Sequence, residues 1–200
     1  MTATVAIIDS GGANIASVRH ALRRLGWEGV LTTDADTIRS ADRVLLPGVG
    51  AAADAMRRLK ECKLVDVIRG LEQPVLGICL GMQLLAEASE EDDVECLGII
   101  EGTVGKLSAS PDQPVPNMGW CPLTSSAEHP LLDGLGEGDY FYFLHSYALP
   151  VSADTLAAAK HADAFSAIVG RENFFAAQFH PERSARAGAR LLKNFLELKP

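Results

Sequence analysis

The stretch Pro74-Val75-Leu76-Gly77-Ile78-Cys79-Leu80-Gly81-Met82-Gln83-Leu84-Leu85 decides the fold. A short apolar run ends at a cysteine, and a helix-like pattern begins directly after it. This layout is typical of a nucleophile elbow, a sharp strand-to-helix turn that presents a reactive residue. Gly77 and Gly81 stand two positions to either side of Cys79, where a Cβ would clash in so cramped a turn. The amides and dipole at the start of the following helix favour a thiolate, so we predict that Cys79 is a nucleophile.

The residues before and around this stretch alternate between strand-like and helix-like patterns. The expected strands are 5–8, 44–46 and 75–78, and the expected helices are 15–25, 52–71 and 81–88. Such an order predicts an α/β fold, with a central, mostly parallel sheet flanked by helices on both faces. Ligands in these folds bind beyond the carboxyl ends of the strands. Residues 9–14, residues 47–50 and Cys79 all lie at such ends.

The second half of the chain has a different pattern. Strand-like segments are expected at 98–107, 118–123, 140–149, 155–161, 164–169 and 173–179, followed by a helix at 184–198. Short consecutive strands indicate hairpins, so we expect an antiparallel addition to the parallel sheet. With 200 residues and no linker-like tract, we expect one domain spanning residues 1–200.

The composition excludes several classes of protein. Hydrophobic residues make up 48% and charged residues 22%, which is incompatible with a disordered or fibrous chain. The net charge of −8 and the lack of a basic stripe argue against a nucleic-acid partner. No apolar run approaches the roughly 20 residues of a membrane span. The four cysteines lack CxxC spacing, which argues against zinc, and they are too sparse for a disulfide scaffold, so we expect a cytoplasmic protein without a metal.

A base for the cysteine is offered by Gln178-Phe179-His180-Pro181-Glu182. In an extended segment, residues two apart point to the same side. His180 and Glu182 could therefore face one site, with the imidazole as base and the carboxylate fixing its tautomer. Each motif alone also has a structural interpretation, since a buried cysteine is usually a small hydrophobe and a His-Pro-Glu is often a surface turn.

The chain also offers candidate donors for an oxyanion hole. The turn Pro47-Gly48-Val49-Gly50 has accessible amides because little side chain covers them. Taken alone, this turn could also be a structural turn without a role in catalysis. The N–H of Leu80, directly after the cysteine, is the natural second donor. Gln83, one turn into the helix, could bind a polar substrate. His145 lies either in the core or in the cleft.

These motifs, taken in order along the chain, resemble those of the triad-type (class I) glutamine amidotransferases, and more narrowly the glutaminase subunits of imidazole glycerol phosphate synthases. The likeness runs through Asn14-Ile15-Ala16-Ser17-Val18, Leu46-Pro47-Gly48-Val49-Gly50, the elbow, Leu97-Gly98-Ile99-Ile100-Glu101-Gly102, Pro116-Asn117-Met118-Gly119-Trp120, Tyr142-Phe143-Leu144-His145-Ser146-Tyr147 and the His-Pro-Glu segment. The resemblance covers the chain from end to end.

The resemblance implies that Cys79 attacks the side-chain amide of L-glutamine and forms a thioester, with His180 transferring protons and Glu182 orienting it. It implies that backbone amides of Val49 or Gly50 and of Leu80 hold the oxyanion. Glutamine would be bound by Gly48, Gln83, His145, Ser146 and Tyr147. No metal or organic cofactor is implied.

The resemblance further implies a heterodimer with a (β/α)8-barrel cyclase, which receives the ammonia in L-histidine biosynthesis. The residues expected to face this partner are Asn14, Asn117, Met118, Trp120 and Arg183. The chain departs from the family's usual residues at Ser10, Ala13, Asn117, Cys121 and Arg183. None of these departures touches the expected triad. Asn117, Cys121 and Arg183 lie in segments that resemble the partner-facing surface, so they concern docking and the passage of ammonia.

Three alternatives remain open from the sequence. The chain could be a glutaminase of the same superfamily serving anthranilate, aminodeoxychorismate or pyridoxal phosphate synthesis. It could be a non-catalytic docking module, although Cys79, His180 and Glu182 together argue against that. It could also be a hydrolase that acts alone, of the γ-glutamyl hydrolase kind.

Overall fold

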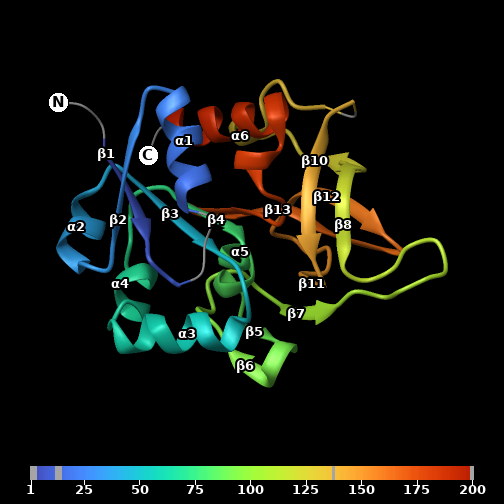
Figure 1. Ribbon diagram of the computed structural model, residues 1–200, viewed down its shortest axis with the longest axis horizontal. Helices are drawn as coiled ribbons and strands as arrows, with labels where there is room; N and C mark the ends of the chain where they lie inside the picture. Colours follow the sequence, from blue (N-terminus) through green and yellow to red (C-terminus); the bar gives the residue numbers. More distant parts are fainter. Residues whose placement is uncertain (1–3, 12–14, 137, 199–200) are drawn as a thin grey trace.

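The computed structural model describes residues 4–11, 15–136 and 138–198. Its centre is a sheet with the strand order β2-β1-β3-β4-β14-β13-β12-β9 (Figure 1). The strands are β1 (Thr4–Ile8), β2 (Glu28–Thr32), β3 (Arg43–Gly48), β4 (Val75–Cys79), β9 (Ser125–Ser126), β12 (Thr155–His161), β13 (Asp163–Arg171) and β14 (Phe174–Ala177). The five from β2 to β14 pair in parallel, and β13, β12 and β9 continue the sheet in antiparallel fashion. The expected mixed sheet is therefore confirmed.

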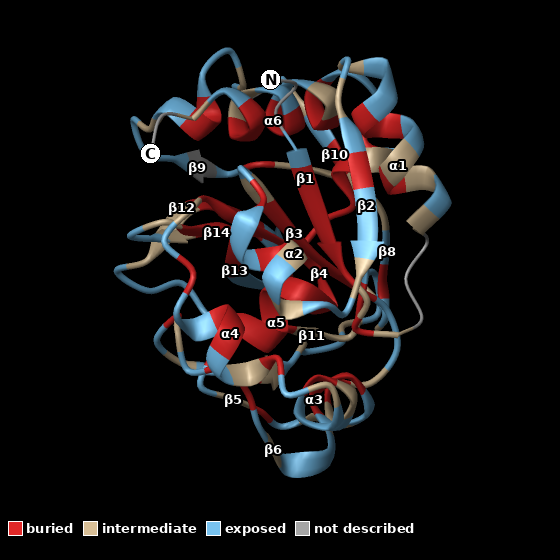
Figure 2. Cartoon of the chain, turned by 90° about the vertical axis from the view of Figure 1, so that its left-hand side faces the viewer, coloured by how far each residue is buried: buried red, intermediate tan, exposed pale blue. Residues whose placement is uncertain are grey.

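Helices cover both faces of the sheet, which is why its central strands are buried along their length (Figure 2). In β1, Val5 and Ile7 face one core cluster, whereas Ala6 and Ile8 face the other. The first cluster includes α1 (Ile15–Arg24) and α6 (Ala185–Glu197). The second includes α2 (Ala35–Ser40), α3 (Ala52–Glu61), α4 (Val65–Arg69) and α5 (Leu80–Leu85). No helix in the described part of the chain is long and apolar enough to cross a membrane.

Smaller elements lie beside the sheet on the side where β4 ends (Figure 1). An antiparallel ribbon pairs β8 (Asn117–Pro122) with β10 (Tyr140–His145). A second small sheet contains β11 (Tyr147–Ala148), β7 (Thr103–Lys106), β5 (Ala88–Ser89) and β6 (Val94–Glu95). Three short 3-10 helices complete the described chain: η1 (Glu91–Asp93), η2 (Pro130–Leu132) and η3 (Pro181–Arg183).

The expectation of a single helix over residues 52–71 is wrong, because the helix is interrupted between α3 and α4. Lys63 adopts a left-handed conformation with φ of 57°. The N–H of Leu64 donates to the carbonyl of Leu59 and that of Lys63 to the carbonyl of Lys60. These two bonds form a Schellman cap, which glycine usually makes. The apolar spacing continues across the break, so periodicity alone could not reveal it.

Other boundaries also differ from the expectations. The helix expected at 81–88 ends at Leu85, and the strand expected at 98–107 is confined to Thr103–Lys106. The strand expected at 140–149 is interrupted at Ser146, because the chain passes there from β10 into a different sheet. The structure also contains β2 and α2, which we do not predict from the sequence. Asp34 caps α2 by accepting from the N–H of Thr37, a local signal that could have located that helix.

Candidate active site

Cys79 stands where β4 passes into α5, in a strained conformation with φ of 54° and ψ of −111°. A Cβ on Gly81 would lie 1.6 Å from the carbonyl oxygen of Leu46, and one on Gly77 would lie 2.8 Å from that of Gly81. Neither gap can hold a carbon atom, so both positions require glycine. The backbone geometry is that of a nucleophile elbow.

His180 and Glu182 lie beside this cysteine and are almost completely shielded from solvent. The Nδ1 of His180 lies 2.9 Å from Oε1 of Glu182, and their side chains are only 8% and 2% exposed. Burial disfavours the charged ring, but hydrogen bonds to Cys79 and Glu182, together with their negative charges, outweigh it and raise the pKa of His180 to about 10. The three side chains therefore form a hydrogen-bonded set in which Cys79 and Glu182 support a protonated imidazole.

His180 itself is extended, with φ of −96° and ψ of 97°, but the chain turns directly after it, so the extended segment expected from the sequence does not reach Glu182. β14 ends at Ala177, and Pro181–Arg183 form the 3-10 turn η3. The His180 N–H donates to the carbonyl of Tyr142, while the Ser184 hydroxyl donates to the carbonyl of His180 and accepts from the N–H of Tyr142. These bonds to β10 turn the chain, and the His180–Glu182 contact is made across the turn rather than along a strand.

Cys79 and His180 open onto a pocket of about 320 Å³. Its other walls come from the turn after β3, from α5 and η1, and from the end of the β8–β10 ribbon. The lining residues are Val49, Gly50, Cys79, Leu80, Gln83, Glu91, Pro116, Leu144, His145, Ser146, Tyr147 and His180. The structure thus gathers at one site most of the residues expected for catalysis and substrate binding. Gly48 is outside this lining, since it pairs with Cys79 in the sheet and packs against Leu80.

The candidate oxyanion donors come from two elements that line the pocket together with Cys79. Leu80 is the first residue of α5, so its N–H has no earlier turn of that helix to bond. Gly50 adopts φ of 95° in the turn after β3. The buried Ser10 hydroxyl fixes the start of this turn by donating to the carbonyl of Pro47, at 2.7 Å. This hydrogen bond gives a structural role to one of the departures from the family pattern.

Some residues of the site carry no signal in the sequence. Glu91, on η1, brings a carboxylate to the pocket, and its Oε2 accepts from the N–H of Ala52 at 3.2 Å. No local pattern marks Glu91, because only the tertiary packing of η1 against α3 brings it there. Gln178 belongs to the His-Pro-Glu segment without an expected role, yet its side chain is fully buried between Gln83 and Cys79.

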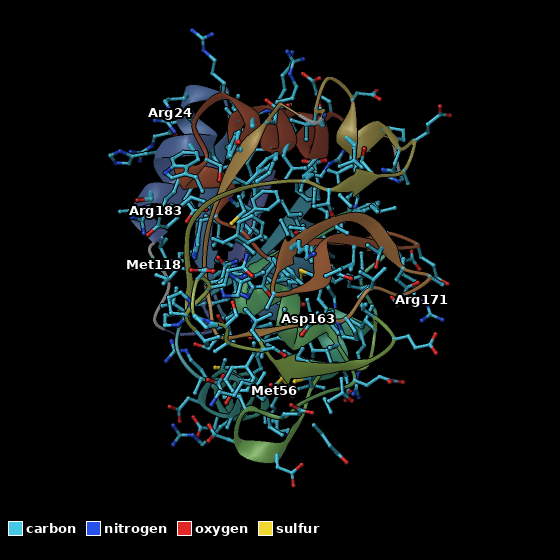
Figure 3. The ribbon with its side chains drawn as sticks, turned by 90° about the vertical axis from the view of Figure 1, so that its right-hand side faces the viewer. Arg24, Met56, Met118, Asp163, Arg171 and Arg183 are labelled. Atoms are coloured by element: carbon cyan, nitrogen blue, oxygen red, sulfur yellow. The ribbon has the colours of Figure 1, made fainter. Side chains whose placement is uncertain are left out.

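The residues expected to face a partner are only partly exposed. Met118 is 68% and Trp120 50% exposed. The guanidinium of Arg183 lies 4.3 Å from the centre of the Tyr142 ring, on the same side of the molecule as Met118 (Figure 3). Asn117 is buried, because it points from β8 toward the interior. Asn14 and the departure at Ala13 lie outside the described residues.

Comparisons with known proteins identify the family of this chain. The profile of the family described as Glutamine amidotransferase class-I matches residues 6–198. The subunit HisH of imidazole glycerol phosphate synthase from Xanthomonas euvesicatoria is 53% identical over 194 residues, covering 97% of each chain. HisH 1 of Vibrio vulnificus is 47% identical over 200 residues, covering 97% of this chain and 98% of its own.

Solved structures show the same fold at low sequence identity. A protein of Thermoplasma acidophilum that is described as part of a GMP synthase superposes with a TM-score of 0.74 at 19% identity, covering 98% of this chain and 93% of its own. A glutamine amidotransferase from Thermotoga maritima gives a TM-score of 0.67 at 16% identity, covering 98% and 97%.

Proposed function

The chain belongs to the class-I glutamine amidotransferases and, among them, to the HisH subunits of imidazole glycerol phosphate synthase, and from this premise we propose how its residues carry the reaction. The proposal is that the chain hydrolyses L-glutamine to L-glutamate and ammonia at Cys79. The observation that carries it is the buried, hydrogen-bonded set of Cys79, His180 and Glu182 at the pocket of about 320 Å³. Membership of the HisH group also disfavours the chorismate-linked and free-standing alternatives.

The Cys79 thiolate attacks the amide carbon of glutamine, and the carbonyl electrons move onto oxygen. When the tetrahedral intermediate collapses, the C–N bond breaks and the His180 imidazolium gives its proton to the departing ammonia. A thioester to Cys79 remains. Neutral His180 then takes a proton from water, the resulting hydroxide attacks the thioester, and glutamate leaves as the thiolate returns. Glu182 holds Nδ1 of His180 throughout, which keeps the other ring nitrogen available for these transfers.

The oxyanion formed in both steps needs donors close to the attacked carbon. We assign this role to the N–H of Leu80 and to that of Val49 or Gly50. Leu80 lies at the start of α5, and the other two lie in the turn after β3 and line the same pocket. Preorganised amides stabilise developing charge without a reorganisation of solvent.

A free amino acid also carries an α-ammonium group, which needs an acceptor in the pocket. Among the lining residues, Glu91 supplies a carboxylate. We therefore assign the α-ammonium group of glutamine to Glu91. Gln83 stands between Tyr147 and Gln178, donating to the carbonyl of the first and to Oε1 of the second, and with Ser146 it shapes the wall that holds the substrate.

We further propose that the ammonia passes to a (β/α)8-barrel cyclase in a cytoplasmic heterodimer, and not into solvent. The exposed side chains Met118 and Trp120, with Arg183 stacked on Tyr142, supply the apolar and aromatic surface typical of an interface. The cyclase would combine this ammonia with its nucleotide substrate to form imidazole glycerol phosphate and an aminoimidazole carboxamide ribotide.

Glutamate release, measured with the chain alone and then with the cyclase and its nucleotide ligand, tests the proposal. Cys79→Ala is expected to lower kcat by at least about 10⁴-fold, because the thioester can no longer form. Cys62→Ala, at the end of α3, is the matched control and should keep wild-type activity. Glutamate release by the Cys79→Ala protein at more than a few per cent of the wild-type rate would contradict the mechanism. Failure of the cyclase to stimulate glutamate release would contradict the proposal that the cyclase is the partner.

A further inference from the structure

The β8–β10 ribbon presents two different faces. Side chains on a strand alternate between faces, so Met118 and Trp120 point outward, where they are exposed, and Asn117 points inward, where it is 3% exposed. Asn117 pairs directly with His145 across the ribbon. We assign the outer face of β8 to the partner. Its inner face therefore meets the pocket wall at the buried polar pair Asn117–His145.

The hydrogen bonds of this pair fix the position of the proton on the ring. His145 Nδ1 lies 2.9 Å from the carbonyl oxygen of Tyr147, which can only accept, so Nδ1 carries the proton. His145 Nε2 lies 3.1 Å from Nδ2 of Asn117 and accepts from that amide. The Cys121 thiol donates to Oδ1 of Asn117 at 3.6 Å, which sets the orientation of the amide. Each group in the pair has one role, and the ring is neutral.

The surroundings of His145 agree with a neutral ring. Burial, together with repulsion from His161 and His180, lowers the pKa of His145 to about 4. The hydrogen bond to the carbonyl of Tyr147 opposes this shift but is outweighed. The rings of Phe143 and Phe165 pack against the imidazole. An imidazolium in this place would lack a counter-charge, and its Nε2–H would point at the Asn117 amide donor.

The carbonyl of Tyr147 connects this pair to the nucleophile. It also accepts from Nε2 of Gln83 at 2.9 Å. The same Gln83 nitrogen lies 3.1 Å from Oε1 of Gln178, whose own amide nitrogen lies 4.0 Å from the sulfur of Cys79. A continuous chain of buried polar groups therefore runs from β8 to the attacking atom.

We propose that Asn117 and His145 are positioning residues that hold the Tyr147 carbonyl, and with it the wall of the glutamine pocket, from the inner face of β8. The ring acts through Tyr147 and Gln83, so it is distinct from the residues that touch the reacting atoms. This inference rests on the proposed function, because it assigns the wall to glutamine. It also connects the partner-facing strand β8 to the substrate pocket through hydrogen bonds.

Two substitutions at His145 separate the two hydrogen bonds. His145→Gln places an amide near the Nε2 position, so it keeps a partner for Asn117 and loses the donor to Tyr147. His145→Asn does the reverse. We expect H145Q to raise KM for glutamine about tenfold, the value of one hydrogen bond of roughly 1.4 kcal/mol, with kcat changed less than about twofold. H145N should raise KM by less than half as much.

The matched control is His161→Gln. His161 is also a buried histidine bonded to a carbonyl, that of Pro114, and it lies outside the pocket lining, so KM should stay at the wild-type value. Thermal melting of all three variants separates loss of fold from loss of positioning, since a merely structural effect lowers the active fraction and leaves KM unchanged. Equal KM for H145Q and H145N would overturn the inference.

A long-range ¹H–¹⁵N spectrum of the histidine rings at pH 7 gives a second test that needs no activity. We expect the His145 proton on Nδ1 with Nε2 bare. Asn117→Asp, which replaces the amide donor by an acceptor of the same shape, should move a proton onto Nε2. A wild-type ring already protonated at Nε2 would refute the inference. Absence of glutamine hydrolysis in a protein with the Nδ1–H ring would instead count against the proposed function alone.

Discussion

Cys79 stands on a turn with no room around it, whereas His180 stands on a turn that hydrogen bonds hold in place. At the elbow, Gly77 and Gly81 let the backbones of neighbouring elements approach to distances that exclude a Cβ. At η3, the buried Ser184 bonds the chain to β10 and to the carbonyl of His180. One segment depends on the absence of side chains and the other on a particular side chain.

This difference decides what each turn can tolerate. A space that is already filled by backbone cannot relax, so any added atom at the elbow must move β3 or α5. A turn held by hydrogen bonds can lose one bond and keep its path, at the cost of a less constrained imidazole. Substitutions at the elbow should therefore prevent or severely weaken folding, whereas those at η3 should leave the protein folded and lower kcat.

The largest effect is expected from Gly81→Ala. Its Cβ would lie 1.6 Å from the carbonyl oxygen of Leu46, and that oxygen belongs to the backbone of a central strand. We expect the free energy of unfolding to fall by about 4 kcal/mol or more, or no folded protein at all. Urea unfolding followed by circular dichroism measures it. Gly138→Ala, where a Cβ meets nothing within 4 Å, is the control, and similar losses at both positions would break the comparison.

The same difference explains what could be predicted from the sequence. The elbow was predictable because its constraint is local: glycines at fixed positions between an apolar run and a helix pattern. His180 and Glu182 pair as the sequence predicts, but they meet across the turn η3, which begins directly after the extended residue His180, and not along a continuing strand. The turn is imposed by Tyr142 and Ser184, and a sequence pattern does not show which distant strand will bond a segment.

Two other features were missed because the sequence carries no local signal for them. Lys63 ends α3 in a left-handed conformation where glycine would have marked the boundary, so the break between α3 and α4 was hidden. Glu91 reaches the pocket only because η1 packs beside α3. Local chemistry predicts local geometry, and tertiary contacts supply the remainder of the site.

The next effect in size is expected from Glu182→Gln, which alters the base and leaves the elbow intact. The amide keeps an oxygen that can accept from Nδ1 of His180 but removes a negative charge from a buried site. We expect kcat to fall by roughly 10²-fold with KM for glutamine nearly unchanged, because Glu182 lies behind the histidine and outside the pocket lining.

The pH profile of this variant gives a direction as well as a size. In the wild type, burial opposes the charged ring, but Cys79 and Glu182 hold the pKa of His180 at about 10. Removing the Glu182 charge takes away part of what raises that pKa, so the pKa falls and the alkaline limb of the kcat profile moves to lower pH. Glu197→Gln, on the exposed end of α6, should change neither kcat nor the position of the alkaline limb of its pH profile. An unmoved limb in E182Q would show that the carboxylate does not support the imidazolium.

The smallest effect is expected from Ser184→Ala, which removes the side chain that holds η3 but leaves its backbone bonds. Two buried hydrogen bonds are lost, to the carbonyl of His180 and from the N–H of Tyr142, and we expect the free energy of unfolding to fall by about 1–3 kcal/mol. A less constrained His180 should lower kcat a few-fold, while KM stays constant because the pocket wall is untouched. Ser40→Ala removes an exposed serine bond to Thr37 and should change neither stability nor rate. If S184A lost as much stability as G81A, the base would depend on close packing as the elbow does, and the contrast between the two turns would be wrong.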